Sequence, residues 1–414
     1  MMLPPHSLLP PRMLIRSLLV AGITSHPMLL APGLSILNFL SKPRGPLFNV
    51  ERNPILHAIL KSFLYNHFCA GENASEVKAT IQNIKNMGFR GVILTYAKET
   101  SGKTSDKKDL SNDESQSVDT EIMAWHQGVL QTVKMIGDGD FLALKLTGAG
   151  EAVTSALSSG KLLPKQMESA LLDVCDEAIS RHVNVFLDAE QHHVQPGIDK
   201  VALNLMRRYN RDGVAVVFNT YQGYLKSTPR ILLDHLHNAR EEQFVIGIKL
   251  VRGAYMSTEP RRLIHDTKEE TDISYDSIAE GLIQGQYENW TQDESFSSPK
   301  LELFLATHNR PSTLKAQKLQ NSRMHAKLPL IRIQYGQLLG MADEVSFTLL
   351  QLNKEIASAA TEVYKCLTWG TLNDCIFYLL RRANENKDAV TRTLAEYKAL
   401  KHEVLRRMTN IFSS

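Results

Sequence analysis

Two cations follow a long apolar run in the middle of the chain. Residues 244–256 read FVIGIKLVRGAYM, and Lys249 and Arg252 stand where the apolar pattern stops. A buried cation is costly unless it meets an anion, so this arrangement suits an anionic ligand. Gly253 and Ala254 are small enough to let the backbone approach a large ligand closely. On this segment alone, a strand running into an ordinary loop with solvated Lys and Arg is an equally good interpretation.

Polar residues follow several other apolar runs in the same way. They are Lys145, Asp188, Glu190, Gln191, Tyr221, Gln222, Tyr255, Thr307, His308, Asn309 and Gln337. In a (β/α)8 barrel the carboxyl ends of the strands carry the chemistry. A purely structural barrel has little reason to gather polar groups at one rim. The pattern therefore predicts a ligand-binding rim.

Apolar strand-like runs alternate with helical patterns along most of the chain. The expected strands begin at Gly91, Phe141, Asn184, Val214, Phe244, Leu301, Leu330 and Val363. The expected helices span residues 120–135, 164–181, 197–211, 228–241, 272–288, 311–320 and 371–388. Strands that alternate with helices imply parallel pairing. Eight such units favour a closed (β/α)8 barrel, with an open doubly wound sheet as the alternative.

The rest of the chain suggests a helical lead-in, one barrel and a tail. Apolar spacing predicts helices over 55–70 and 73–87, the second capped by Asn73 or Ser75. Residues 101–118 are polar and lack an apolar period, so we expect an exposed, disordered insertion at about 100–118. The expected organisation is a lead-in at 1–50, lead-in helices at 51–89, the barrel at 90–395 and a helical tail at 396–414.

Composition narrows the class of protein. The 414 residues are 43% hydrophobic and 22% charged, which is typical of a globular protein. A net charge of +3 is too weak to indicate a nucleic-acid partner. The four cysteines lie far apart without a CxxC pair, which fits a reducing compartment and argues against a zinc site or a disulfide framework.

The first 50 residues are basic and contain no acid, because the first acidic residue is Glu51. This composition is typical of a mitochondrial transit peptide. Residues 17–40 are also uncharged over a length that could span a membrane. Pro27 and Pro32 argue against a straight spanning helix. We therefore expect a buried or membrane-surface helical lead-in.

Two further motifs are weak. Gly148 and Gly150 follow a strand, but the third glycine of a dinucleotide fingerprint would fall at Val153. His192 and His193 suggest a metal, but neighbouring residues of a strand point to opposite faces. We therefore expect a turn at the glycines and no metal site at the histidines.

Eight segments together resemble the proline dehydrogenase family, and most closely its fungal members. They keep the family's order from about residue 55 onwards: ALKLTG, FLDAEQ, NTYQGYLK, IKLVRGAYM, ATHN, GQLLGM, YKCLTWG and LLRRANEN. The resemblance implies a distorted (β/α)8 barrel that binds FAD at the strand ends. It also implies hydride transfer from L-proline to flavin N5, giving 1-pyrroline-5-carboxylate in the first step of proline catabolism. Electrons would then pass to a membrane quinone, which implies peripheral association with the matrix side of the mitochondrial inner membrane.

The resemblance also assigns roles to individual residues. Arg381 and Arg382 match the paired arginines that grip the substrate carboxylate, and Glu385 could hold one of them in place. Substrate-pocket positions match Lys145, Tyr255, Leu339 and Cys366, and the catalytic positions match Lys145, Asp188 and Lys249. The flavin-contacting positions match Asp188, Gln222, Lys249, Arg252, Gly253, Ala254, Lys268, Thr307, His308 and Asn309.

One residue departs from the family pattern. Cys366 stands where the family commonly has a tyrosine that closes the pocket over the proline ring. Family members that act on hydroxyproline also carry a smaller residue there. The alternatives to L-proline are therefore hydroxyproline or another cyclic imino acid. A weakly catalytic, flavin-binding paralogue is the other alternative.

Overall fold

The computed structural model describes residues 3–42, 45–97, 119–287, 298–355, 361–388 and 390–412. The insertion expected at about 100–118 lies outside these ranges. The side chain of Glu385 also lies outside what the structure describes, although its backbone belongs to a helix.

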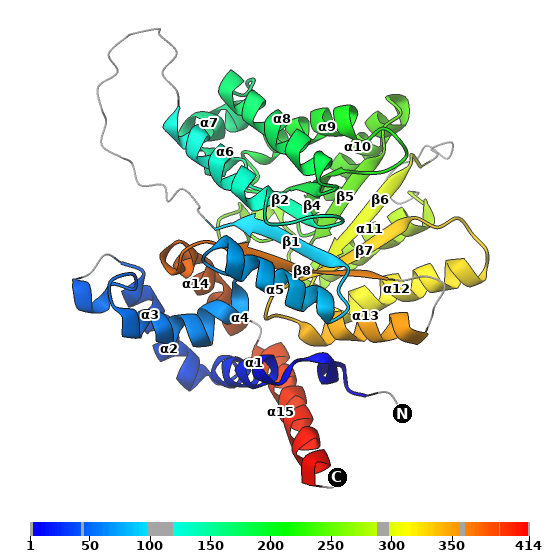
Figure 1. Ribbon diagram of the computed structural model, residues 1–414. Coiled ribbons are helices and arrows are strands. Elements are labelled where there is room, and N and C mark those ends of the chain that lie inside the picture. The colour runs from blue at the N-terminus through cyan, green and yellow to red at the C-terminus, as the bar shows by residue number, and fades with distance from the viewer. Residues whose placement is uncertain are drawn as a thin grey trace, which may run out of the picture. The chain divides into compact units, whose positions relative to one another are not determined.

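Eight strands form a closed barrel in chain order (Figure 1). They are β1 (Gly91–Tyr96), β2 (Phe141–Leu144), β3 (Asn184–Leu187), β4 (Val217–Gln222), β5 (Ile246–Val251), β6 (Leu301–Ala306), β7 (Arg332–Leu338) and β8 (Glu362–Trp369). The pairs β2–β3, β3–β4, β4–β5, β5–β6 and β1–β8 are parallel. The (β/α)8 prediction is confirmed, and the open sheet is excluded.

Helices follow the strands; seven of them match the expected ranges, and those at Glu151–Ser159 and Asp343–Glu355 were not expected. The helices are α6 (Thr120–Val133), α7 (Glu151–Ser159), α8 (Lys165–Ser180), α9 (Gln195–Tyr209), α10 (Thr228–Glu241), α11 (Lys268–Gln284), α12 (Arg310–His325), α13 (Asp343–Glu355) and α14 (Leu372–Asp388). Helix α11 starts four residues before the expected position, because the Thr267 side chain caps it by accepting from the Glu270 N–H. The Gly148 segment is a 3-10 turn, Thr147–Ala149, as the missing third glycine suggested.

The lead-in is helical, but it is more broken than expected. It contains α1 (Pro11–Thr24), α2 (Pro27–Leu40), α3 (Pro54–Leu60), α4 (Asn66–Phe68) and α5 (Ala74–Asn86). The single helix expected over 55–70 is wrong, because a π-helical turn, Lys61–Tyr65, separates α3 from α4. Asn73 caps α5 by accepting from the Glu76 N–H. The last helix, α15, spans Val390–Phe412.

The chain groups into two compact units, which are described separately below. Unit 1 comprises residues 1–98 and 336–414, and unit 2 comprises residues 99–335.

The core of unit 2 contains a cluster of four phenylalanines from different strands. Phe141, Phe186, Phe218 and Phe304 are fully buried. The Phe141 and Phe186 rings stack with centroids 4.3 Å apart, and the Phe304 ring meets Phe186 edge-on at 4.9 Å. Such contacts fix ring positions more sharply than aliphatic packing does. The cluster fills the interior beneath the last residues of these strands.

At the amino ends of β4 and β5, a buried amide holds the backbone in place. Asn210 Oδ1 accepts from the Val216 and Val217 N–H groups at 2.9 and 2.8 Å. Its Nδ2 donates to the carbonyls of Val217 and Val245 at 2.7 and 2.8 Å. One side chain thus fixes the starts of β4 and β5, which leaves the opposite ends for polar groups.

In unit 1, the lead-in helices share a core with the last barrel helix. Val20, Leu40, Tyr65 and Phe68 cluster with buried residues of α14. The Tyr65 hydroxyl donates to the Gly370 carbonyl at 2.6 Å. Among the described residues, no single helix is both long and apolar enough to cross a membrane. Helices α1 and α2 reach that length and composition only as a pair bent by 98°.

Candidate active site

A buried ion pair stands at the carboxyl ends of β3 and β5. Lys249 Nζ donates to Asp188 Oδ1 at 2.6 Å, and the two side chains are 10% and 21% exposed. The Lys249 ammonium also lies 4.7 Å from the centre of the Phe186 ring. A lysine inside a strand is tolerated because the carboxylate and the ring face offset its desolvation. The structure thus brings these two predicted residues together.

Arg252, just beyond β5, is held by partners from two helices and a strand end. Its Nε donates to Asp272 Oδ1 at 2.9 Å. Its Nη1 and Nη2 donate to Thr307 Oγ1 at 2.6 Å and to Ser312 Oγ at 2.8 Å. The guanidinium also lies 4.4 Å from the centre of the Tyr275 ring. Arg252 is therefore a cation of fixed position, which rules out the solvated-loop alternative for this residue.

Asp272 links several of the predicted cofactor residues. It accepts from Lys268 on the exposed surface of α11 and from Asn309 Nδ2 at 3.4 Å. Burial alone would raise the pKa of Asp272, but the hydrogen bonds from Lys268 and Arg252 lower it. Asn309 also caps α12 and donates its N–H to Thr307 Oγ1 at 3.1 Å. The half-buried His308 lies between Thr307 and Asn309 in the chain.

Gln222 and the Gly253–Ala254 turn form a second polar group. Gln222 is buried, donates from Nε2 to the Glu190 carbonyl at 3.2 Å and accepts from the Ala254 N–H at 3.4 Å. Gly253 has φ +143°, and a Cβ there would overlap the Tyr224 ring. Only glycine fits this position, and it leaves the backbone uncovered. Ala254 is exposed and Tyr255 is half-buried beside it in the chain.

Glu190 is a buried carboxylate at the same rim. It accepts from the backbone N–H of Thr147 at 3.1 Å and from the Thr147 hydroxyl. Burial raises the pKa of Glu190, while the two hydrogen bonds from Thr147 and the charge of Lys145 oppose that rise. Lys145 is half-buried after β2, and its carbonyl accepts from Trp125 Nε1 at 3.0 Å.

The remaining predicted residues belong to unit 1. Leu339 is buried, and its N–H donates to the carbonyl of half-buried Cys366 at 2.9 Å. Arg381 and Arg382 are adjacent on α14, and Arg382 is buried with its guanidinium 5.0 Å from the centre of the Tyr378 ring. Leu339 and Cys366 are thus neighbours through their backbones.

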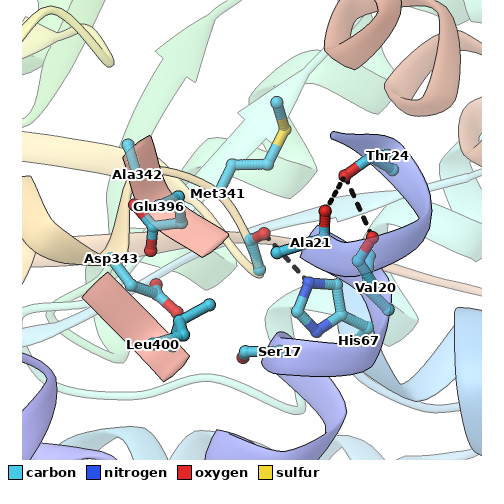
Figure 2. Close-up of a pocket in the computed structure, with 11 residues that line it drawn as sticks. Ser17, Val20, Ala21, Thr24, His67, Met341, Ala342, Asp343, Glu396 and Leu400 are labelled. Carbon is cyan, nitrogen blue, oxygen red and sulfur yellow. Dashed lines mark hydrogen bonds between the residues drawn. The ribbon is translucent and has the colours of Figure 1, made fainter. Parts of the chain in front are cut away.

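A small cavity of about 50 Å³ lies beside the loop that follows Leu339 (Figure 2). Helices α1 and α15 line it together with His67 and residues 340–343. His67 Nε2 donates to the Gly340 carbonyl at 3.0 Å, and Lys365 Nζ donates to Asp343 Oδ1 at 2.7 Å. Desolvation and the charge of Arg16 lower the pKa of His67 to about 4. The cavity has room for a few water molecules.

Among the residues that the structure describes, no group of three or more His, Cys, Asp or Glu side chains could hold a metal ion. His192 and His193 lie in a turn, so the strand argument used for them above was wrong. His192 instead forms an ion pair with the buried side chain of Glu259.

Sequence reasoning missed three partners at this rim: Asp272, Ser312 and Thr147. Asp272 could have been found, because it lies one helical turn after Lys268. Ser312 and Thr147 gave no comparable signal in the sequence.

Comparison with known proteins decides the family. The sequence pattern described as "Proline dehydrogenase" matches residues 77–394. The chain belongs to the proline dehydrogenase family. The resemblance found in the eight segments is thereby confirmed.

Individual relatives cover the chain to different extents. A "Probable proline dehydrogenase, mitochondrial" of Schizosaccharomyces pombe is 36% identical over 56% of this chain and 48% of its own length. The "Carbapenem antibiotics biosynthesis protein CarD" of Pectobacterium carotovorum is 30% identical over 89% of this chain and 88% of its own. The "Hydroxyproline dehydrogenase" of Bos taurus is 27% identical over 95% of this chain and 90% of its own. The chain thus spans about half the length of the S. pombe relative.

The fold also matches a solved structure. The proline utilization A protein of Bdellovibrio bacteriovorus superposes with a TM-score of 0.66 at 16% identity, over 88% of this chain and 37% of that one. At this identity the likeness supports the barrel fold alone.

Proposed function

We propose that this protein is an FAD-dependent dehydrogenase that oxidises L-proline to 1-pyrroline-5-carboxylate and passes the electrons to a membrane quinone. The observation that carries the proposal is the fixed cationic group at the carboxyl ends of β5 and β6. It contains Lys249 paired with Asp188, and Arg252 bound to Thr307 and Asp272. In a barrel of this class, such a group is placed for chemistry rather than for stability.

The residues at this rim fit a flavin. Gly253 leaves uncovered backbone beside the turn, which a bulky planar ligand can approach. Arg252, Lys249 and the Gln222 amide supply donors for a ring system that becomes electron-rich on reduction. Bound there, FAD would supply the hydride acceptor. We assign its binding to Asp188, Gln222, Lys249, Arg252, Gly253, Ala254, Lys268, Thr307, His308 and Asn309.

The protein's own groups would bind and orient the substrate. Arg381 and Arg382 would hold the carboxylate, since guanidinium groups grip it bidentately. Glu385 would restrain one of these arginines. Lys145, Tyr255 and Leu339 are assigned to substrate binding by the family resemblance. Asp188 would hold the Lys249 ammonium in position, where it favours negative charge developing nearby.

A second candidate substrate is hydroxyproline. The observation behind it is the half-buried Cys366, which stands where the family commonly has a tyrosine. Its side chain is much smaller than a tyrosine and would leave more room for the substrate ring. Cys366 accepts a backbone hydrogen bond from Leu339, the other residue proposed for the apolar part of substrate binding. The Bos taurus relative named hydroxyproline dehydrogenase matches over most of both chains, which supports this candidate.

The location follows from the same reasoning. The relatives of S. pombe, Caenorhabditis elegans and Drosophila melanogaster are named mitochondrial. Together with the basic, acid-free first 50 residues, these names support a mitochondrial enzyme on the matrix side of the inner membrane. A quinone acceptor requires at least peripheral contact with that membrane.

The test is anaerobic bleaching of the bound flavin by L-proline and, separately, by trans-4-hydroxy-L-proline. Wild type, Cys366→Tyr and the control Cys366→Ala are compared. If proline bleaches the flavin and Cys366→Tyr does not change this, the main proposal is supported and hydroxyproline is rejected as the substrate. Preference for hydroxyproline that Cys366→Tyr reverses and Cys366→Ala retains makes Cys366 the specificity residue. If neither substrate bleaches the flavin of loaded protein, both substrate proposals fail, and a weakly catalytic, flavin-binding paralogue becomes the favoured interpretation.

A further inference from the structure

The N-terminal segment is built into the fold of unit 1. Arg407 on α15 donates to the carbonyls of Ser7 and Leu9 at 3.1 and 2.8 Å. The His6 ring forms a 2.8 Å hydrogen bond with Glu396 of the same helix. The inner side of α1 buries Leu14, Ser17, Val20, Ala21 and Thr24. These contacts give residues 6–24 defined partners within unit 1.

The outer side of α1 is apolar as well. Ile15, Leu19 and Ile23 are 57%, 47% and 48% exposed. They are spaced four residues apart, so they form one stripe along the helix. A helix at the surface of a globular protein normally turns polar residues outward, and this one does not.

The stripe on α1 is the first of several in this region. Further exposed apolar side chains on α2, the turn after it, α3 and the π-helical turn are Met28, Leu29, Ile36, Phe39, Leu47, Phe48, Ile55, Ile59 and Phe63. The Phe39 and Phe48 rings meet edge-on at 5.4 Å, which joins the α2 stripe to the turn that follows. More than half of the exposed large apolar side chains in the described part of the chain lie in residues 3–63. Such a concentration marks an interaction surface.

The charge of the region identifies its partner. Helices α1 and α2 contain no carboxylate, and Arg12 and Lys42 are exposed, whereas the exposed Glu51 and Arg52 before α3 offset each other. A contact between two copies of this surface would bring like charges together. An anionic lipid surface instead accepts both the apolar stripes and the cations.

We propose that the exposed apolar side chains of α1, α2, α3 and the π-helical turn form a docking face for an anionic phospholipid membrane, with α1 and α2 lying in the interface rather than crossing it. The bend of 98° between the two helices is compatible with both lying in one plane. The inference rests on the proposed function in one respect, because it names the surface through which a quinone-reducing enzyme meets its membrane. Vesicle binding is measured without turnover, so the two can fail separately.

The test is co-sedimentation of the full chain with vesicles of 70:30 phosphatidylcholine and phosphatidylglycerol, and with phosphatidylcholine alone. The variant is Ile15→Gln/Leu19→Gln/Ile23→Gln. The control is Leu162→Gln/Leu328→Gln/Leu330→Gln, whose residues are 77%, 47% and 46% exposed and belong to unit 2. If circular dichroism shows that the α1 variant does not fold, the variant Met28→Gln/Phe39→Gln on α2 replaces it in the same experiment.

We expect wild type and control to sediment with the anionic vesicles, and the α1 variant to bind at least tenfold more weakly. Phosphatidylcholine vesicles or high salt should weaken wild-type binding severalfold, because the electrostatic part is lost. Wild type that stays in solution with the anionic vesicles overturns the proposal, as does an α1 variant that binds them like wild type. A dimer by light scattering that the variant abolishes, without vesicle binding, would make a second copy the partner instead.

Discussion

The ion pair between Lys249 and Asp188 makes a quantitative prediction. Each side chain depends on the other, since Lys249 Nζ lies 2.6 Å from Asp188 Oδ1 and the two are only 10% and 21% exposed. Breaking a buried pair by removing one partner costs about 3–5 kcal/mol, and the partial exposure of Asp188 should bring this towards about 2–3 kcal/mol for Asp188→Asn. Lys249→Met should cost less, about 1–2 kcal/mol, because water can reach the carboxylate.

The double variant separates the pair from its surroundings. The double variant Asp188→Asn/Lys249→Met leaves no uncompensated charge. We therefore expect its free energy of unfolding to lie near that of the more stable single variant. The coupling energy would then be roughly 2 kcal/mol. The contact of Lys249 with the Phe186 ring is lost in both lysine variants and cancels in the cycle.

The assay is urea unfolding of wild type, both single variants and the double variant at pH 7.5. The surface pair Lys226–Asp266, with side chains 44% and 68% exposed, serves as the control cycle and should couple by less than about 0.5 kcal/mol. A coupling energy for Lys249 and Asp188 no larger than that of the control would refute the reasoning. The lysine would then be held by the ring and by solvent rather than by the carboxylate.

Two other perturbations have defined outcomes. Gly253→Ala should lower the free energy of unfolding by about 2–4 kcal/mol, because its Cβ overlaps the Tyr224 ring at a positive φ. Gly160→Ala, at φ +68° with open space around it, should cost only about 1 kcal/mol, and equal costs would count against the overlap. The native pKa of His67, about 4, lies below its ordinary value of 6.5, so the unfolded chain takes up the proton first. Acidification from pH 6.5 to 4 should therefore lower the free energy of unfolding by roughly 3 kcal/mol. Urea denaturation of His67→Gln at the two pH values should lack this decrease.

The strands were predictable because each is a local feature. The run 141–144 is apolar over its whole length, and 301–306 is apolar except for Glu302, as buried parallel strands favour. Their polar successors could be found by the same local rule, since chain direction places them at one rim. The break between α3 and α4 was not predictable in this way. Apolar spacing continues through the π-helical turn, whose Tyr65 packs into the core of unit 1 among residues distant in the chain, and local sequence spacing carries no sign of that packing.

The partners of the site residues were harder to predict, because they lie far apart in the chain. Ser312 is 60 residues from Arg252, and Asp188 is 61 residues from Lys249. The sequence indicated that each cation needed an anion or an acceptor, but it could not say which one. Barrel closure supplies that choice, since it fixes which strand ends are neighbours.

The register of the strands explains why the Lys249–Asp188 ion pair lies at this depth. Lys249 pairs in register with Phe304 on β6 and Thr220 on β4. Its ammonium passes the face of Phe186, and the four buried rings fill the interior below it. The lysine therefore has a polar environment only towards the rim, where Asp188 stands. Since Asn210 fixes β4 and β5 at their amino ends, a shift of either strand would cost buried hydrogen bonds at one end and the ion pair at the other.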